Sequence, residues 1–348
     1  MTETTVQRYD LANMRKLLIE FPLQIEEAVR IGKSASITFR GRKINNIVVT
    51  GLGGSAIGGD VLRSYTSEEL SVPFIVNRHY MLPEFVNNNS LVIVSSYSGS
   101  TEETIAAHLD ANKRRASVLC ITSGGETERL AKKSKQPVIK IPKGYPPRTA
   151  LGYSFFPALI SLTKMNLLPS QDKAIRETIA LLKRKAKMYA SLNGNNPAYE
   201  LAKRLYMKLP IIYSSADHFD AVNLRWRGQL AENAKVLAFG HVLPEMNHNE
   251  IVGWKVLQRI MNDIAVVFLR DVDELPRVKT RMKITKGIVS EFTNRVIEVH
   301  SEGKYLLARI FSLIYLGDWA SYYLALMNGV DPTPVRVIDY LKWELGKT

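Results

Sequence analysis

The residues with the clearest chemical potential in this sequence are glycines and hydroxyls that follow two apolar, strand-like runs. The first group, GLGGSAIGGD at residues 51–60, follows IVVT and precedes a predicted helix that begins at residue 61. A glycine-rich turn between a strand and a helix presents backbone N–H groups to an anion. The spacing of Gly51, Gly53 and Ala56 also fits a dinucleotide fingerprint. This segment therefore predicts an anion site and leaves a dinucleotide and a sugar phosphate both open.

The second group, SSYSGSTEET at residues 95–104, stands at the start of a predicted helix over residues 102–115. Hydroxyls donate to phosphate oxygens, and the free N–H groups and dipole of a helix start favour an anion by ~0.3–1 kcal/mol. An ordinary helix cap needs only one hydroxyl, which Ser98 or Thr101 would supply. Since the loop carries a surplus of hydroxyls, we predict that it binds phosphate through Ser96, Ser98, Ser100 and Thr101.

The dinucleotide alternative requires an acidic residue at the end of the second strand, to hold the ribose diol. That place is occupied by Asn77, Arg78 and His79. Arg78 would suit the 2′-phosphate of NADP, but an NADP site does not explain the hydroxyl-rich loop. We therefore predict a sugar phosphate, whose sugar faces Gly53, Gly54 and Ser55.

The elements that position these loops form a pattern of strands alternating with helices, which indicates an α/β fold with parallel sheets flanked by helices. Apolar, β-branched runs occupy residues 46–50, 73–77, 91–96, 117–122 and 137–141 in the first half, and 209–214, 235–239, 264–269 and 295–299 in the second. A helical stretch, 170–206, separates the two sets. We expect a phosphate-binding domain with N-terminal helices at 1–165, a helical linker at 166–200 and a second domain that carries the catalytic residues at 201–348.

Composition narrows the class of protein. A hydrophobic share of 46% and a charged share of 23% are typical of a globular protein in water. The polar N-terminus predicts a cytoplasmic location, and the charged residues within the aromatic stretch 304–328 favour a buried core or dimer helix over a membrane span. The net charge of +14 is spread along the chain, so we expect a basic surface and no nucleic-acid partner. Cys120, the single cysteine, predicts a buried structural thiol and excludes a thiolate metal cluster.

Together the two loops resemble the sugar isomerase (SIS) domain. The segments PPRTALGYSFFP (146–157), AENAK (231–235) and PEMNHNEIVGW (244–254) are similar to those of the bifunctional phosphoglucose/phosphomannose isomerases of the phosphoglucose isomerase superfamily. The resemblance covers roughly residues 20–345. It implies two SIS domains, each a flavodoxin-like α/β sandwich, in a homodimer with the active site at the interface, and no metal or cofactor.

The resemblance also implies an activity. Glucose 6-phosphate and mannose 6-phosphate would be interconverted with fructose 6-phosphate through a cis-enediol, in glycolysis and gluconeogenesis. From the residues alone, Glu232 is a glutamate at a helix end, where the dipole disfavours it; the resemblance makes it the catalytic base. Arg148 lies in a proline-rich turn before an apolar helix, and its guanidinium suits the oxygens of an enediolate.

Three further residues are assigned by position. The resemblance gives His248 the opening of the sugar ring, from the partner subunit, and we expect nearby Asn and Glu side chains to fix its tautomer. It assigns assistance in ring opening to a lysine near the C-terminus, which Lys342 matches, and Thr333 is a candidate substrate contact. Glu245, His248 and Glu250 lack the helical His pair of a zinc hydrolase, so we expect no metal site.

Two other classes of function remain open. SIS domains also act as sugar-phosphate-binding regulators, and other sugar-phosphate isomerases or deglycases use similar loops. A regulator would need a DNA-binding extension, which the chain lacks, and would not need Glu232, His248 and Arg148 together. The isomerase is therefore the favoured interpretation.

Overall fold

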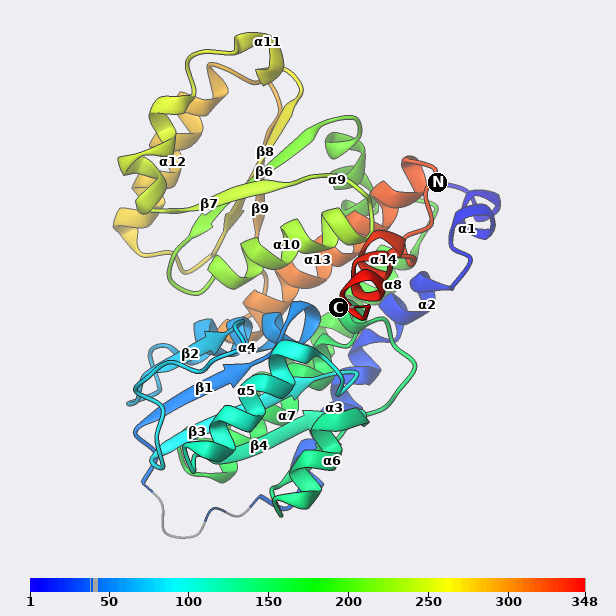
Figure 1. Cartoon of the computed structure of the whole chain (residues 1–348). Helices are drawn as coiled ribbons and strands as arrows, with labels where there is room; N and C mark the ends of the chain where they lie inside the picture. Colours follow the sequence, from blue (N-terminus) through cyan, green and yellow to red (C-terminus); the bar gives the residue numbers. More distant parts are fainter. Residues whose placement is uncertain (38, 40–42, 348) are drawn as a thin grey trace.

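The computed structural model describes residues 1–37, 39 and 43–347, and it has two halves that are each built on a parallel sheet (Figure 1). The first sheet has the order β2-β1-β3-β4-β5 and the second the order β7-β6-β8-β9. The first consists of β1 (Asn46–Thr50), β2 (Phe74–Asn77), β3 (Ser90–Ser96), β4 (Ser117–Thr122) and β5 (Val138–Lys140). The second consists of β6 (Leu209–Ser215), β7 (Phe239–Leu243), β8 (Ile264–Arg270) and β9 (Val296–His300).

Helices cover both faces of the first sheet, which confirms the predicted α/β class. Ile47 and Val49 of β1 pack into the same core as α4 and α7, whereas Val48 between them packs into a separate core with α5. This alternation is expected of a strand buried on both faces, whose sequence is a continuous apolar run. In the first half the helices are α1 (Glu3–Tyr9), α2 (Met14–Ile19), α3 (Phe21–Ser34), α4 (Gly53–Thr66), α5 (Glu102–Lys113), α6 (Gly125–Lys133), η1 (Pro147–Thr149) and α7 (Leu151–Lys164).

The remaining helices connect and complete the second half. They are α8 (Asp172–Ala190), α9 (Pro197–Leu205), α10 (Asp220–Glu232), η2 (Glu245–His248), η3 (Glu250–Gly253), α11 (Gln258–Met261), α12 (Pro276–Ser290), α13 (Leu306–Met327) and α14 (Arg336–Leu345). The stretch predicted as a helical bridge thus contains α8 and α9, and Asn196 caps α9 by accepting from the N–H groups of Ala198 and Tyr199. Because α8 packs along α13 and α3, it belongs to the packed body of the protein.

Two predicted boundaries are wrong. The strand expected at 235–239 lies at Phe239–Leu243, because the chain leaves α10 through Lys235 at φ 58° and pairs with β6 only from Phe239 onward. Helix α4 begins at Gly53, well before the predicted residue 61. A Cβ on Gly54 would lie 2.5 Å from the carbonyl oxygen of Pro147, so this glycine permits close packing within a helix instead of forming a turn.

Helix α13 forms the centre of the second half and packs against α8, α9 and α10. It is the one helix in the described part of the chain that is long and apolar enough to cross a membrane, but 89% of its most apolar window is buried inside the protein. Tyr315, Trp319 and Tyr323 are among its fully buried side chains. The expectation of a buried helix over residues 304–328 is therefore confirmed.

We predict that Gly317→Ala destabilises the protein by about 1–3 kcal/mol, because a Cβ there would lie 2.5 Å from the ring of the buried Trp226 and the core would be overpacked. Gly287→Ala is the matched control, since Gly287 lies inside α12 and a Cβ would meet nothing within 4 Å. That control should gain up to about 1 kcal/mol from helix propensity. Urea unfolding of both variants measures the difference, and shifts of the same sign would refute the packing explanation.

Candidate active site

The first sheet places its two glycine- and hydroxyl-rich loops side by side. In the strand order 2-1-3-4-5 the switch point lies between β1 and β3, and ligands of such sheets bind at the carboxyl ends of these strands. Gly53, Gly54 and Ser55 form the first turn of α4, shortly after β1, and the loop after β3 runs from Tyr97 to Thr101. The predicted sugar and phosphate loops are therefore the two walls of this crevice.

Hydrogen bonds hold the two loops against each other. The buried Ser55 hydroxyl accepts from the N–H of Tyr97 at 3.1 Å. Within the second loop, Ser96 Oγ accepts from the N–H of Gly99 at 3.1 Å, and Ser98 Oγ accepts from the N–H of Ser100 at 3.2 Å. Ser55 and Ser96 thus shape the loops, while Ser98 and Ser100 expose their side chains.

The start of α5 keeps its backbone donors available. Thr101 is the N-cap residue, but its hydroxyl accepts no hydrogen bond from the helix. The ordinary capping role that the sequence allowed for Thr101 is therefore not observed. Free N–H groups at a helix start, beside the exposed hydroxyls of Ser98 and Ser100, form the arrangement that binds phosphate in other proteins.

A buried arginine forms the second part of the site. Arg148 lies in η1 and is only 3% exposed. Its Nε donates to Asn233 Oδ1 at 2.7 Å, and its Nη2 donates to the carbonyl oxygens of Pro332 at 2.7 Å and Thr333 at 2.8 Å. Its Nη1 lies 3.5 Å from Glu232 Oε2. Glu232, Arg148 and Thr333, which are far apart in sequence, are thus brought together.

Burial lowers the pKa of the Arg148 guanidinium from its ordinary value, and the neighbouring Glu232 carboxylate acts in the opposite direction. An arginine remains protonated after such a shift, because its ordinary pKa lies far above neutral. Arg148 is therefore a fixed positive charge beside the predicted base, as an enediolate would require.

Glu232 is the last residue of α10, as predicted, and its side chain is 32% exposed. The unfavourable position at a helix end is offset by neighbouring cations. Arg148 contacts the carboxylate, and Lys235 Nζ donates to the carbonyl oxygens of Glu232 and Pro334. Lys235 therefore closes the end of α10 and holds it against the loop that carries Thr333.

Sequence reasoning missed the residues that support this pair. Arg225 is buried with Asp318, with 2.8 Å between Arg225 Nη2 and Asp318 Oδ2, and Gln229 donates to the same carboxylate at 2.9 Å. Arg225 Nη2 also donates to the backbone carbonyl of Arg148 at 3.1 Å, and Asn233 Nδ2 donates to Ser321 Oγ at 3.0 Å. The available signal was spacing, since Arg225, Gln229 and Glu232 recur at helical intervals on one face of α10.

One cavity of about 180 Å³ joins the first and second parts of the site. The sequence-predicted residues Gly53, Gly54, Arg148 and Glu232 all line it. It lies between the start of α4 and the face of α10 that carries Gln229 and Glu232. The closeness of these elements depends on Gly54, whose missing side chain lets α4 contact the backbone of η1.

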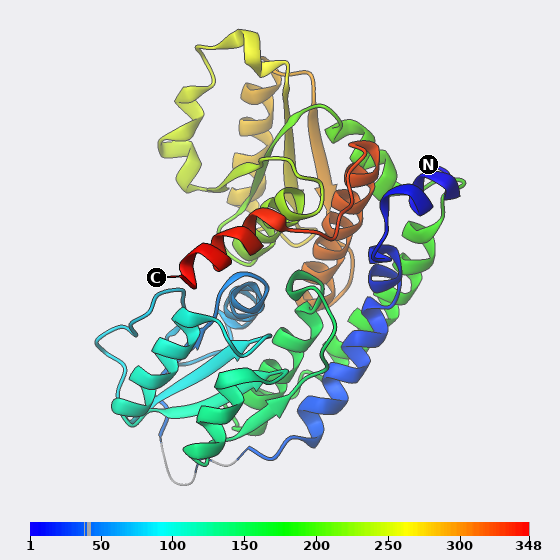
Figure 2. The ribbon, with the colours of Figure 1, turned by 45° about the vertical axis from the view of Figure 1, so that its right-hand side comes forward.

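Neither His248 nor Lys342 is among the described residues that line this cavity. Exposed His248 ends η2 beyond the carboxyl end of β7, whereas Glu232 precedes β7, and this strand alone spans about 16 Å. The expected fixing of His248 by its neighbours is not observed among the described residues, since Asn247 donates to Thr285 and Asn249 donates to Glu245. Lys342 is exposed on α14, which lies between the two halves in Figure 2.

Two predictions about other residues can be compared with the structure. Cys120 is buried, as predicted, and burial raises the pKa of its thiol to about 12. In the described part of the chain, no group of three His, Cys, Asp or Glu side chains is placed to hold a metal ion.

Comparison with known proteins identifies the family of this chain. The family model described as the bacterial phospho-glucose isomerase C-terminal SIS domain matches residues 194–345. A bifunctional phosphoglucose/phosphomannose isomerase of Caldicellulosiruptor bescii is 42% identical over 96% of this chain and 99% of its own. One from Aquifex aeolicus is 36% identical over 86% of this chain and 90% of its own.

The fold has solved counterparts. A hypothetical protein of Thermus thermophilus superposes with a TM-score of 0.75 over 99% of this chain and 92% of its own, at 15% identity. This likeness supports the fold alone, whereas each of the two sequence relatives covers at least 86% of both chains. The chain therefore belongs to the family of bifunctional phosphoglucose/phosphomannose isomerases.

Proposed function

We propose that this protein is a metal-independent aldose–ketose isomerase that interconverts glucose 6-phosphate and mannose 6-phosphate with fructose 6-phosphate. The observation that carries the proposal is the pairing of Glu232 with the buried Arg148 in a cavity that Gly53 and Gly54 also line. The hydroxyl-rich loop that begins at Ser96 is bonded to Ser55, which follows the cavity-lining Gly54, and supplies a phosphate anchor.

In the proposed reaction the Glu232 carboxylate removes the proton from C2 of the open-chain aldose. The electron pair of that C–H bond forms the C1–C2 double bond of an enediolate, and the negative charge moves to the oxygen on C1. Glu232 then returns the proton to C1, while the oxygen on C2 becomes the ketose carbonyl and its proton passes to the oxygen on C1. Arg148 stabilises the intermediate by its fixed charge.

To form both the glucose and the mannose epimer, a proton must be able to reach either face of C2. Glucose and mannose 6-phosphates differ only at this carbon, which is flat in the enediol. Glu232 is the single carboxylate that lines the cavity in the described part of the chain. We propose that the intermediate turns about its C2–C3 bond above this one base, and that the small side chain of Thr333 leaves space for the turn.

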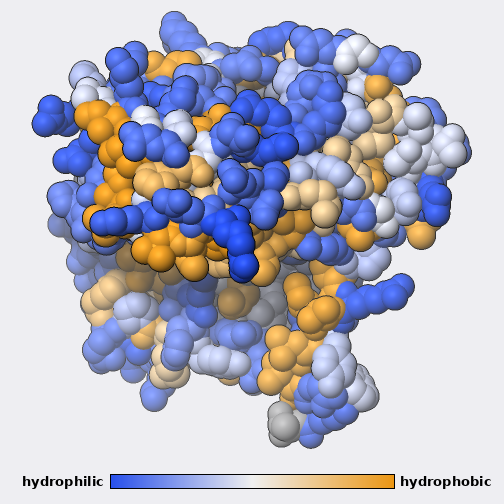
Figure 3. Space-filling model, turned by 90° about the horizontal axis from the view of Figure 1, so that it is seen from above, coloured by the Kyte–Doolittle hydropathy of each residue, from blue (hydrophilic) through white to orange (hydrophobic). Residues whose placement is uncertain are grey.

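We further propose a homodimer with the active site at its interface, in the cytoplasm and in the central metabolism of glucose. Two features support the dimer. The exposed His248 can join Glu232 only from a second copy, because β7 separates the two residues within one chain. Helix α14 also projects from the body in Figure 3, with apolar side chains uncovered, including Val337 at 82% and Trp343 at 60% exposure.

We predict that Ser98→Ala combined with Thr101→Ala raises KM for fructose 6-phosphate by on the order of 10- to 100-fold, with little loss of kcat. Phosphate contacts are equal in the ground and transition states, and hydrogen bonds to a charged group are the stronger class. Steady-state kinetics measure both constants. Ser170→Ala, an exposed serine at the start of α8, is the control. An unchanged KM in the double variant would refute the phosphate assignment.

Metal independence is tested with a chelator. Wild-type protein should turn over both aldose phosphates equally well with or without EDTA.

A further prediction concerns the base. Glu232→Gln should lower the rates with both aldose phosphates by about 10²–10⁴-fold and to the same extent. The measurement is kcat for each sugar in a coupled assay, with ligand binding determined separately. Glu126→Gln, on the surface of α6, should leave both rates unchanged. Survival of only the mannose 6-phosphate activity would reveal a second base.

The shared site predicts complementation between inactive variants. Glu232→Gln and His248→Gln should each be inactive as pure proteins. After unfolding and refolding as an equal mixture, about half of the dimers are hybrids with one intact site each, so activity should return to about one quarter of wild type. A mixture that stays inactive, although wild-type protein recovers under the same treatment, would refute a site built from two chains.

A further inference from the structure

Arg78 is a chemically prominent residue that the reaction described above does not use. It follows β2 directly and lines the same cavity as Arg148 and Glu232. Its side chain is 39% exposed. The proposed sugar-phosphate site gives no role to this arginine, which the sequence offered only as a partner for a dinucleotide.

A count of donors separates Arg78 from Arg148. A guanidinium has five N–H donors. Arg148 directs four of them to protein acceptors, namely Asn233, Glu232 and the two carbonyl oxygens of Pro332 and Thr333. Arg148 therefore supplies charge to the cavity but has at most one donor left for a substrate oxygen.

Arg78 is bound to the protein on one side only. Its Nη1 lies 3.3 Å from Asp60 Oδ1, and its Nη2 contacts the other oxygen of that carboxylate. In the described part of the chain these are its only hydrogen bonds, so three of its five donors remain available. Arg225, the third arginine of the cavity, is buried in its pair with Asp318 and presents little surface.

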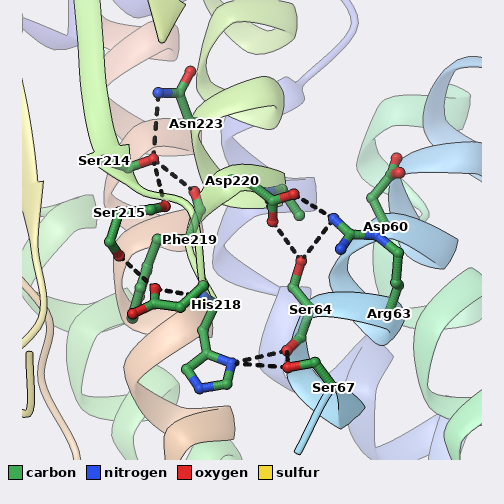
Figure 4. A network of polar contacts seen from close by, with 12 residues as sticks. Asp60, Arg63, Ser64, Ser67, Ser214, Ser215, His218, Phe219, Asp220 and Asn223 are labelled. Atoms are coloured by element: carbon green, nitrogen blue, oxygen red, sulfur yellow. Dashed lines mark hydrogen bonds and ion pairs between the residues drawn. The ribbon is translucent and has the colours of Figure 1, made fainter. Parts of the chain in front are cut away.

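Asp60 fixes the direction in which Arg78 points. The Asp60 side chain is 9% exposed on α4, and burial raises its pKa while the charge of Arg78 opposes that rise. The two residues therefore hold each other in place. Figure 4 shows that Arg63, one turn later on α4, turns instead toward Asp220 at the start of α10, while the Asp60 carboxylate points away from that pair.

The strand order indicates which end of a substrate meets Arg78. The hydroxyl-rich loop follows β3, whereas Arg78 follows β2, and β1 lies between them. Two strand spacings separate these loops by about 10 Å, a span comparable with the length of an open-chain hexose 6-phosphate. None of residues 96–101 is among the described residues that line the cavity. A sugar anchored at the hydroxyl loop thus brings its reacting end, and not its phosphate, to Arg78.

We propose that Arg78, held by Asp60, donates hydrogen bonds to the oxygens on C1 and C2 of the substrate and of its enediolate. This inference rests on the proposed isomerase function and deepens it. In this arrangement Arg148 provides the buried charge and Arg78 provides the directional donors, at the reacting end of the sugar and away from the hydroxyl-rich loop.

The test compares two ligands that differ only at the reacting end. In 5-phospho-D-arabinonate a carboxylate replaces the enediolate, and in 5-phospho-D-arabinitol an alcohol replaces it. Arg78→Gln should weaken binding of the arabinonate by about 10- to 100-fold and binding of the arabinitol by less than about threefold, measured by calorimetry. Arg78→Lys should show an intermediate loss, since it keeps the charge but not the planar fork.

Arg63→Gln is the matched control, because Arg63 lies on the same helix as Asp60 and makes an ion pair of the same kind but does not line the cavity. It should weaken both ligands equally or not at all. The double variant Asp60→Asn/Arg78→Gln removes the buried pair together, avoids an unpaired Asp60 and should show the same selective loss as Arg78→Gln.

Three outcomes would overturn the inference. They are an equal loss of both ligands in Arg78→Gln, no loss of either, or the same selective loss in Arg63→Gln. These results differ from a failure of the proposed function, in which wild-type protein would neither turn over fructose 6-phosphate nor prefer the arabinonate. Wild-type turnover with normal Arg78 variants would leave the isomerase intact and refute only the role of Arg78.

Discussion

The arrangement of the site depends on satisfying one buried cation. Arg148 is withdrawn from water, and such a charge is costly unless nearly all of its donors find acceptors. Those acceptors come from the end of α10 and from the loop before α14, while Arg148 itself follows the first sheet. Meeting the needs of one guanidinium therefore fixes three distant segments relative to one another. The position of Glu232 is a consequence, because it adjoins Asn233 at the end of the same helix.

The packing between the two halves also holds Arg148 in place. Arg225 of α10 pairs with Asp318 on α13 and also donates to the carbonyl oxygen of Arg148. The second half therefore contacts the turn that carries Arg148. On the other side, Gly54 lets α4 approach that turn more closely than any side chain would allow. The turn is thus held from both directions by contacts that a larger or shorter side chain would break. A rigid charge of this kind needs no reorganisation when negative charge develops beside it.

Much of this fold was predictable from the sequence, because a strand buried on both faces is a continuous apolar run, as at β1, β4 and β8. The failures have local causes. Before β7, the apolar residues Val236 and Ala238 pack on the core from a loop. Their hydrophobicity therefore indicated burial, but it did not indicate hydrogen bonding to a neighbouring strand. At α4 the glycines concealed a helix, because their poor helix propensity is outweighed by close contacts that only the tertiary structure reveals.

In the site, too, some features could be predicted from the sequence and others could not. The hydroxyls of the loop after β3 are neighbours in sequence, so their number alone predicted an anion site. By contrast, the contact between Arg148 and Glu232 crosses the boundary between the halves. The turn around Arg148 suggested that residue, but only the resemblance to a known family indicated Glu232. The count of free donors on each arginine was beyond sequence reasoning altogether, since it depends on which acceptors surround each guanidinium. That count is what distinguishes the two cations that share the cavity: a saturated arginine can stabilise charge but has little capacity to orient a ligand, whereas one held by a single carboxylate can do both.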